Sequence, residues 1–224
     1  AINVPKDVCG DASCLASEFV PSNPTAPIVV LSEFIEYCST KNSGVAIAAF
    51  QHFHASYCSV DNIHVVILDH KLSQDQAHAV LRGYYSVWTE LESRGILPDV
   101  PRPALFTDGK AKLVAMFGGQ DGMNDYFEEG ALVLHTFHTM LHEFVNEISG
   151  FVRRTSCDKR LAAVYKYPLD MVRWITLPDT RPPAQYLART PVSIVTVAVV
   201  QLMHLMVLYK TLRLSPGELS QSFK

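Results

Sequence analysis

The stretch KLVAMFGGQDGMNDYF, residues 112–127, decides the fold of this chain. Its short apolar run over residues 113–117 predicts a strand, which stops at Gly118 and Gly119. The acidic segment that follows predicts a helix beginning near residues 123–125. A strand that ends in glycines before a helix lets the backbone approach a ligand closely and leaves amide groups free at the turn. A plain glycine turn joining a strand to a helix has the same pattern, so the corner alone leaves both readings open.

The composition of the whole chain limits the classes of function. Its 224 residues suffice for one large domain or for one domain with an appendage, and 48 % of them are hydrophobic. The formal net charge of -3, without a basic stripe carrying interleaved aromatic residues, argues against nucleic-acid binding. The five cysteines form no C-x-x-C pair, and Cys38 and Cys58 lie in apolar helical patterns, so we expect reduced, buried thiols. Since the N-terminus does not resemble a signal peptide, we expect a cytoplasmic protein.

Residues 1–96 predict a helical N-terminal region. Its first 26 residues, rich in Pro, Ser and Asp, predict an irregular lead-in. The clearest helix is predicted from Ser73 to Arg94, with Ser73 and Gln76 forming a capping box and Gly95 ending the helix in a left-handed conformation. Further helices are predicted from Pro27 to about Cys38, over residues 45–58, and from Asp61 or Asn62 onwards.

The Pro-rich connector at residues 97–111 is the best domain boundary, and residues 112–224 form the second part. Helices are predicted there over residues 131–148, 161–175 and 190–214. Apolar residues surround almost the whole of the last helix, which is long enough to span a membrane. Because Gln201 and His204 interrupt it, we expect instead a helix buried on most sides in an α/β core.

Several polar groups could carry chemistry elsewhere. His135, His138 and His142 could share one helical face beside Glu143, and these residue types suit zinc. No H-E-x-x-H arrangement is present, so a partly exposed helix face is the preferred interpretation and no metal site is predicted. His52 with His54 is a weaker pattern, and Cys157, close to Arg153 and Arg154, reads as an incidental loop thiol.

Two segments carry a resemblance to a known family. They are LVAMFGGQDGMNDYFEE, from residue 113, and ARTPVSIVTVAVVQLMHLMVLYKTLRLSPGEL, from residue 188, and both resemble the start of the acetyltransferase domain of fungal-type fatty acid synthase β subunits. The helical N-terminal region is similar, with weaker matches, to the segment that precedes this domain. Starter-unit transacylase domains of fungal polyketide synthases resemble the chain less closely. The matching residues are Phe117-Gly118-Gly119-Gln120, Tyr126-Phe127-Glu128-Glu129, Pro191-Val192-Ser193, Val200-Gln201-Leu202, His204, Lys210, Leu212 and Ser215-Pro216-Gly217-Glu218-Leu219.

The resemblance implies an α/β acyltransferase domain, of which residues 112–224 are the first part, behind the helical module. It implies a transacylase that moves a short acyl group from coenzyme A to the phosphopantetheine thiol of an acyl carrier protein, without a covalently bound cofactor of its own. Gln120 would belong to the oxyanion site, supported by the backbone of Gly118 and Gly119. The implied partners are the acyl carrier protein, the α subunit and further β chains in a large hetero-oligomer, with no nucleic acid and no membrane.

Two departures from the family pattern leave two hypotheses open. Asp121 stands where the family usually has Gly, and no G-x-S-x-G nucleophile elbow exists in this sequence. The chain therefore carries half of an active site and no nucleophile, and we expect it to be inactive alone. In the first hypothesis it contributes Gln120 and the surrounding fold to a longer transacylase. In the second it is a non-catalytic assembly element of a fatty acid or polyketide synthase complex.

Overall fold

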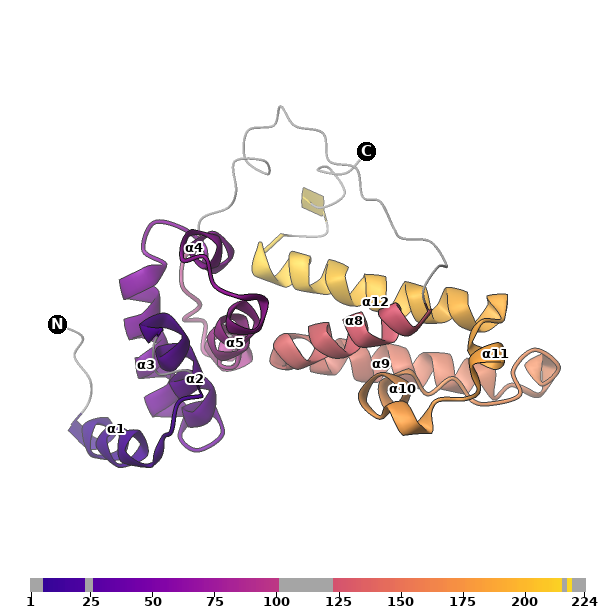
Figure 1. Cartoon of the computed structure of the whole chain (residues 1–224), viewed down its shortest axis with the longest axis horizontal. Coiled ribbons are helices and arrows are strands. Elements are labelled where there is room, and N and C mark those ends of the chain that lie inside the picture. The colour runs from indigo at the N-terminus through magenta and orange to yellow at the C-terminus, as the bar shows by residue number, and fades with distance from the viewer. Residues whose placement is uncertain (1–5, 23–25, 101–122, 215–216, 219–224) are drawn as a thin grey trace. The chain divides into compact units, whose positions relative to one another are not determined.

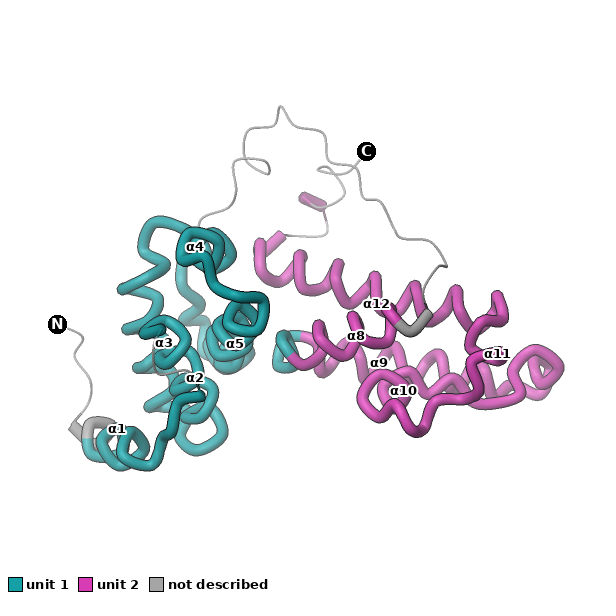
Figure 2. The backbone as a smooth tube through the Cα atoms, in the orientation of Figure 1, with its two compact units in different colours: residues 1–109, 136–140 teal, residues 110–135, 141–224 magenta. Residues whose placement is uncertain are grey.

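The structure is a computed structural model that describes residues 6–22, 26–100, 123–214 and 217–218, and these residues form helices and turns (Figure 1). The chain divides into two compact units, shown in separate colours in Figure 2. Unit 1 is Ala1–Gly109 with Thr136–Met140, and unit 2 is Lys110–His135 with Leu141–Lys224. The helical character predicted for the N-terminal region is confirmed. The predicted α/β fold is not confirmed, because the described residues contain no strand and residues 113–117 lie outside them.

Unit 1 contains the first helices of the chain. In chain order they are α1 (Lys6–Glu18), α2 (Pro27–Ser39), α3 (Ser43–Tyr57), α4 (Ile63–Asp69), α5 (Gln74–Tyr85) and α6 (Trp88–Ser93).

Local sequence explains where three of these helices begin. The side chain of Asn42 accepts hydrogen bonds from the first amides of α3, and Asn62 does the same for α4, as predicted. At α5 the predicted capping box is present, because Ser73 and Gln76 bond reciprocally to each other's backbone amides. Gly95 has a φ of 66°, which confirms the predicted left-handed end after α6.

The centre of unit 1 is the contact of α2 with α3 and α5. Its core includes Ile35, Phe50, Phe53 and Leu91, each almost fully buried. Gly83 of α5 approaches α2 so closely that a Cβ atom there would stand 2.0 Å from the carbonyl oxygen of Ser32. Only glycine permits this distance between the two helices.

Two sequence expectations for unit 1 are wrong. The predicted irregular lead-in contains α1, whose Asp11 accepts a hydrogen bond from Asn42 at 2.9 Å, and the Phe19 ring that follows it lies 5.4 Å from that of Phe34. These contacts with distant residues stabilise a helix that the local sequence does not announce. The single helix predicted from Ser73 to Arg94 is broken between α5 and α6, where Val87 and Trp88 turn into the core.

The helices of unit 2 follow, with two short 3-10 turns. In chain order they are α8 (Met123–Thr136), α9 (His138–Ser156), η1 (Lys159–Leu161), α10 (Met171–Thr176), η2 (Pro178–Thr180), α11 (Ala184–Leu187) and α12 (Thr190–Thr211).

The predicted helix start near residues 123–125 is confirmed by α8, but two other predicted helices in this part are wrong. Residues 131–148 do not form one helix, since α8 and α9 are separated at Phe137. Of the helix predicted over residues 161–175, only residues 171–175 are α-helical, as part of α10, and Leu161 ends the 3-10 turn η1. Pro168 lies inside that stretch and disfavours a helical conformation of the residue before it.

The junction between α8 and α9 belongs to unit 1, although most of both helices belongs to unit 2. The Thr139 hydroxyl donates to the Tyr85 carbonyl at 2.6 Å, and the Thr89 hydroxyl donates to the Thr139 carbonyl at 2.8 Å. The ring of Phe137 lies 5.3 Å from that of Tyr85, and Met140 is almost fully buried. The break at Phe137 therefore has a tertiary cause: the junction is held by α5 and α6.

In unit 2, α12 is the most apolar helix. By length and composition it could cross a membrane, but Val192, Val200 and Met203 on one face are buried inside the unit. On the other side Ile194 and Leu202 keep 55 % and 37 % of their surface exposed, so α12 is buried on one face and not on most sides. Pro191 occupies the first turn, as predicted, and Arg189 takes the N-cap position that was expected for Thr190.

Candidate functional site

The Gly-Gly-Gln corner lies outside the described residues, so Gly118, Gly119 and Gln120 remain predictions from the sequence. Asp121 lies outside them as well. The structure does describe the two helices that carry most of the remaining motif residues, α8 directly after the corner and α12. Their arrangement defines the candidate site.

The helices that carry the two motif segments meet at Gly130, the residue directly after the first segment. A Cβ atom on this residue of α8 would lie 3.1 Å from Cγ2 of Val200 on α12 and 3.5 Å from Cδ1 of Ile175 on α10. The absence of a side chain at position 130 therefore lets α8 approach both helices. Val200 is fully buried and Ile175 nearly so, which makes this contact part of the core of unit 2.

A polar contact joins the same two helices at the surface. Nε2 of His204 lies 3.5 Å from Oε1 of Glu129, with 41 % and 49 % of the two side chains exposed. An exposed pair of this kind contributes about 0–1 kcal/mol to stability, so its share in holding the two helices together is small. Glu129 and His204 are 75 positions apart in the sequence, and both are motif residues.

The first turns of α8 are held by an arginine that the sequence analysis did not single out. The guanidinium group of Arg181 lies 4.5 Å from the ring centroid of the fully buried Phe127, and its Nε–H donates to the Trp174 carbonyl at 2.6 Å. This stacking fixes the start of the helix against the loop that contains η2. No local sequence pattern predicts this stacking, because Arg181 and Phe127 are far apart in the sequence and only the fold brings them together.

Motif residues at the start of α12 have structural roles. The buried Ser193 hydroxyl donates to carbonyls of the preceding turn, those of Arg189 at 3.2 Å and Thr190 at 3.3 Å. Thr196, also buried, donates to the Val192 carbonyl at 3.1 Å. Both hydroxyls donate hydrogen bonds to carbonyls one turn earlier, so these polar side chains can lie on a buried face of the helix.

The histidine cluster considered for zinc is not a continuous helical face. His135 lies in the last turn of α8, whereas His138 and His142 lie in α9, and all three are exposed. Nε2 of His142 lies 3.1 Å from Nδ2 of Asn146. Among the described residues no group of three or more His, Cys, Asp or Glu side chains could hold a metal ion.

The described cysteines separate into two kinds. Cys38 and Cys58 are buried and free, as predicted, and burial raises the pKa of their thiols to about 11 and about 12. They therefore stay protonated and unreactive at neutral pH. Cys14 and Cys157 are free and exposed.

Two histidine–tyrosine pairs lie inside unit 1. Nδ1 of His54 is 3.1 Å from the Tyr84 hydroxyl, and Nε2 of His64 is 3.1 Å from the Tyr85 hydroxyl. Burial lowers the pKa of both histidines, although a hydrogen bond with the Asp99 backbone partly opposes this for His54, and part of His64 still reaches solvent. Burial also raises the pKa of Tyr85, so its hydroxyl stays protonated and forms a neutral hydrogen bond with the His64 imidazole. These pairs connect α3 and α4 to α5, and sequence spacing gave no sign of them.

Comparison with known proteins gives relatives of one kind. No protein-family model matches the chain. The chain is 28 % identical to fatty acid synthase subunit beta of Saccharomyces cerevisiae over 90 % of its own length and 10 % of the relative's. It is 29 % identical to fatty acid synthase subunit beta of Schizosaccharomyces pombe over 76 % of its length, and 28 % identical to fatty acid synthase beta subunit aflB of Emericella nidulans over 73 %. In each case it spans a tenth or less of the relative.

Proposed function

We propose that this chain, a homologue of part of the fungal-type fatty acid synthase β subunits, supplies one side of an acyl-CoA:acyl-carrier-protein transacylase. The reaction transfers acetyl or another short starter unit from coenzyme A to the phosphopantetheine thiol of an acyl carrier protein. Acyl-CoA is the substrate, and the chain binds no cofactor covalently.

One observation supports this proposal above the others. The described parts of the two segments whose motifs resemble the acetyltransferase domain lie together in unit 2, where the motif residues Glu129 and His204 meet. Gly130, the residue directly after the first segment, meets Val200 beside them. A chance resemblance in two unrelated segments would not require their motif residues to come into contact. This packing also fixes α8, the helix directly after the Gly-Gly-Gln corner.

The proposed contribution to catalysis is electrostatic. Attack of a serine nucleophile on the thioester carbon places negative charge on the thioester oxygen, and collapse of the tetrahedral intermediate expels the coenzyme A thiolate. Gln120 and the backbone amides of Gly118 and Gly119 donate hydrogen bonds to that oxygen. The nucleophile itself is not in this sequence, which contains no G-x-S-x-G motif.

The proposed setting is a cytoplasmic multi-subunit synthase. The chain's relatives are named fatty acid synthase beta subunits, which supports membership of such a complex. The acyl carrier protein, the α subunit and further β chains are its proposed partners there. We propose that the chain binds neither nucleic acid nor a membrane. The formal net charge of -3 agrees with the absence of nucleic-acid binding.

Asp121 favours a second candidate function, a non-catalytic assembly segment of a fatty acid or polyketide synthase complex. A carboxylate beside an oxyanion site opposes the charge that develops there unless its side chain points away. If the Gly-Gly-Gln corner no longer takes part in catalysis, the helical module and unit 2 would be retained in evolution because they bind neighbouring subunits.

The test compares Gln120→Ala with a control, Gln185→Ala, in the native polypeptide purified from its source after its intact mass has been measured. Transfer of labelled acetyl from acetyl-CoA to the carrier protein is the readout. We expect Gln120→Ala to lower kcat by about 10²–10³-fold, the usual cost of one oxyanion donor, and Gln185→Ala, on the exposed surface of α11, to leave it unchanged. Equal rates for Gln120→Ala and the unaltered protein would refute the oxyanion role of Gln120. An inactive native polypeptide with a mass near 24.9 kDa would favour the assembly role.

A further inference from the structure

Charge is strongly segregated along unit 2. Residues 123–147 contain five carboxylates and no Lys or Arg, whereas residues 148–176 contain six Lys or Arg and two Asp. We call the six cationic residues the cationic end. They are Arg153, Arg154, Lys159, Arg160, Lys166 and Arg173, and all six are exposed.

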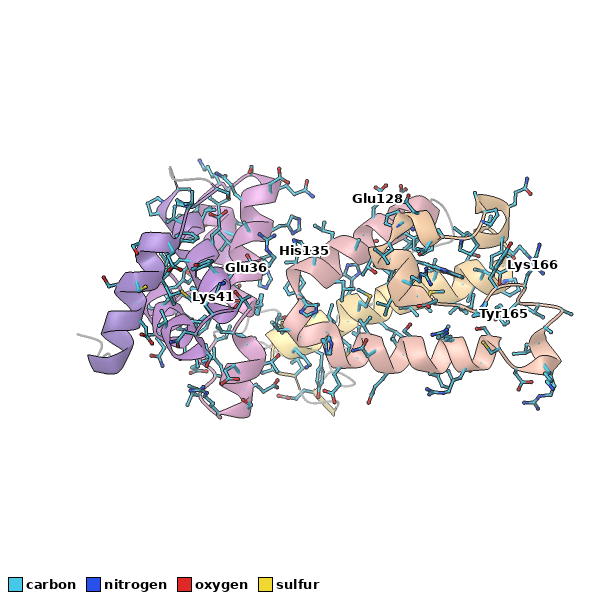
Figure 3. The ribbon with its side chains drawn as sticks, turned by 90° about the horizontal axis from the view of Figure 1, so that it is seen from below. Glu36, Lys41, Glu128, His135, Tyr165 and Lys166 are labelled. Atoms are coloured by element: carbon cyan, nitrogen blue, oxygen red, sulfur yellow. The ribbon has the colours of Figure 1, made fainter. Side chains whose placement is uncertain are left out.

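The fold keeps the cationic end together as one corner of unit 2. The Leu169 amide donates to the buried Ser156 hydroxyl at 2.9 Å, which returns the chain to the last turn of α9. The Val172 amide donates to the hydroxyl of Ser149, which lies two turns before Ser156 on α9, at 3.5 Å. Figure 3 shows Lys166 on the loop at this end of the unit.

Most of these cations are not neutralised inside the protein. Arg160 pairs with Asp158 at 2.6 Å, and Arg153 lies 3.9 Å from Asp170. The other four, Arg154, Lys159, Lys166 and Arg173, have no carboxylate within salt-bridge distance in the described part of the chain. Basic residues in the last turns of α9 and α10 interact favourably with the helix dipoles, which accounts for Arg153, Arg154 and Arg173. It does not account for Lys166, which lies on a loop.

An exposed aromatic residue lies beside these charges. Phe151 keeps 58 % of its surface in solvent, and Arg154, three residues further along α9, shares its face of the helix. The Arg154 guanidinium reaches back over the helix, since a Cβ atom on Gly150 would lie 3.3 Å from its Nη1. Glu147, four residues before Phe151 on α9, shares this face of the helix. Exposed aromatic residues next to arginine are typical of the energetic centre of protein interfaces.

We infer that the cationic end, together with Phe151 beside Arg154, is a docking surface for an acidic protein that offers an apolar pocket to the phenylalanine ring. A single small anion needs convergent donors, whereas these cations are spread over α9, η1, a loop and α10. The net charge of the chain, -3, and the single exposed aromatic at the cationic end do not suit a nucleic acid. An acidic protein surface matches both the spread of charge and the apolar ring of Phe151.

The test places a photoreactive benzoylphenylalanine at position 151 in the native assembly, with the same residue at position 132 as the control. Leu132 is also on unit 2 and 38 % exposed, but lies in the acidic segment on α8. After irradiation, cross-linked peptides are identified by mass spectrometry. We expect position 151, and not position 132, to give products with a peptide of net negative charge from another protein chain or domain.

Charge reversal completes the experiment. Arg154→Glu with Lys159→Glu should reduce the cross-link yield from position 151 by about tenfold, which corresponds to a loss of about 1.4 kcal/mol of binding free energy. Lys41→Glu, an exposed site on unit 1, should leave the yield unchanged. Circular dichroism checks that each variant is folded. Cross-links to lipid, nucleic acid or a basic peptide, no products from position 151, or a yield insensitive to charge reversal would each overturn the inference.

Discussion

The histidines beside Tyr84 and Tyr85 make the stability of unit 1 depend on pH. Adjacent in the chain, the two tyrosines turn their rings in different directions, 85° apart, and each hydroxyl meets a different histidine. Because both histidines have a lowered pKa, the folded state favours neutral imidazole. Below the ordinary histidine pKa of 6.5 the unfolded chain therefore binds more protons than the folded one.

We predict that stability is fully present above pH 6.5 and falls as the pH drops through that value towards the lowered pKa of His54 and His64. The midpoint of thermal unfolding should decrease by a few degrees between pH 7.5 and pH 5.5, more than carboxylate titration alone produces. Differential scanning calorimetry measures this shift. His64→Gln keeps a hydrogen-bond acceptor without the titration and should weaken the pH dependence. His52→Gln, at an exposed position, should not change it, and equal slopes for both variants would contradict the prediction.

At the scale of elements, the approach of α5 to α2 depends on Gly83. A methyl group there would stand 2.0 Å from the Ser32 carbonyl oxygen, which belongs to the backbone of α2 and cannot rotate away. We predict that Gly83→Ala lowers the free energy of unfolding by about 1–3 kcal/mol or more, as overpacking does, despite the better helix propensity of alanine. Urea denaturation measures the change.

Gly10 provides the matched control for this substitution. It lies in α1, and a Cβ atom there would meet nothing within 4 Å. Gly10→Ala should therefore raise stability by up to about 1 kcal/mol through helix propensity alone. A Gly83→Ala protein as stable as Gly10→Ala would mean that α2 and α5 do not approach as described.

The attachment of α8 depends on Arg181. Replacing Arg181 by Ala removes the stacking on Phe127 and the hydrogen bond to the Trp174 carbonyl, so we predict a loss of about 1–2 kcal/mol in unfolding free energy. Arg181→Lys should recover less than half of it, since an ammonium group cannot stack as a plane. Arg189→Ala is the control, because its guanidinium lies 5.7 Å from the Tyr186 ring on an exposed side chain. Equal losses from Arg181→Ala and Arg189→Ala in urea unfolding would contradict the prediction.

Sequence predicted the elements well where local chemistry sets their limits. The caps at Asn62 and Ser73 and the end at Gly95 are local signals, and each is where it was expected. The breaks after α5 and at Phe137 follow from burial of Val87, Trp88 and Phe137 against other parts of unit 1, which no short window of sequence reveals. The helix α1 was not predicted because the contacts that stabilise it, with Asn42 and Phe34, come from distant residues.

The candidate site was predictable in part. The motif residues were named from the sequence, but the contact of Glu129 with His204 and the stacking of Arg181 on Phe127 depend on the fold. The assignment of Gln120 to an oxyanion site stays a prediction, because residues 101–122 lie outside the part that the structure describes. The domain limits at residues 97–111 likewise stay a prediction.

At the scale of the whole molecule, the polypeptide changes units three times. It passes from unit 1 to unit 2 between Gly109 and Lys110, returns at Thr136, and leaves again after Met140. The returning segment is held by the paired hydrogen bonds among Tyr85, Thr89 and Thr139.

We predict that cleavage within residues 97–111 leaves the two fragments associated, because residues 136–140 remain bound to α5 and α6. To measure this association, a protease site is inserted in the connector and the protein is cleaved. Size-exclusion chromatography under native conditions then shows whether the two fragments elute together. Thr139→Val removes the hydroxyl donor with little change in shape and should make the cleaved fragments separate more readily. Immediate separation of the unaltered fragments would show that the returning segment does not hold them.

The returning segment has a consequence for recombination. A gene cut at the codons for the connector would give an upstream product that lacks the five residues that complete unit 1. The downstream product would carry those five residues without the helices that bind them. The helical module is thus not a cassette that can be exchanged between homologues at the connector. An exchange that succeeds would need a second donor insert, the five codons for residues 136–140, taken from the same parent as the first.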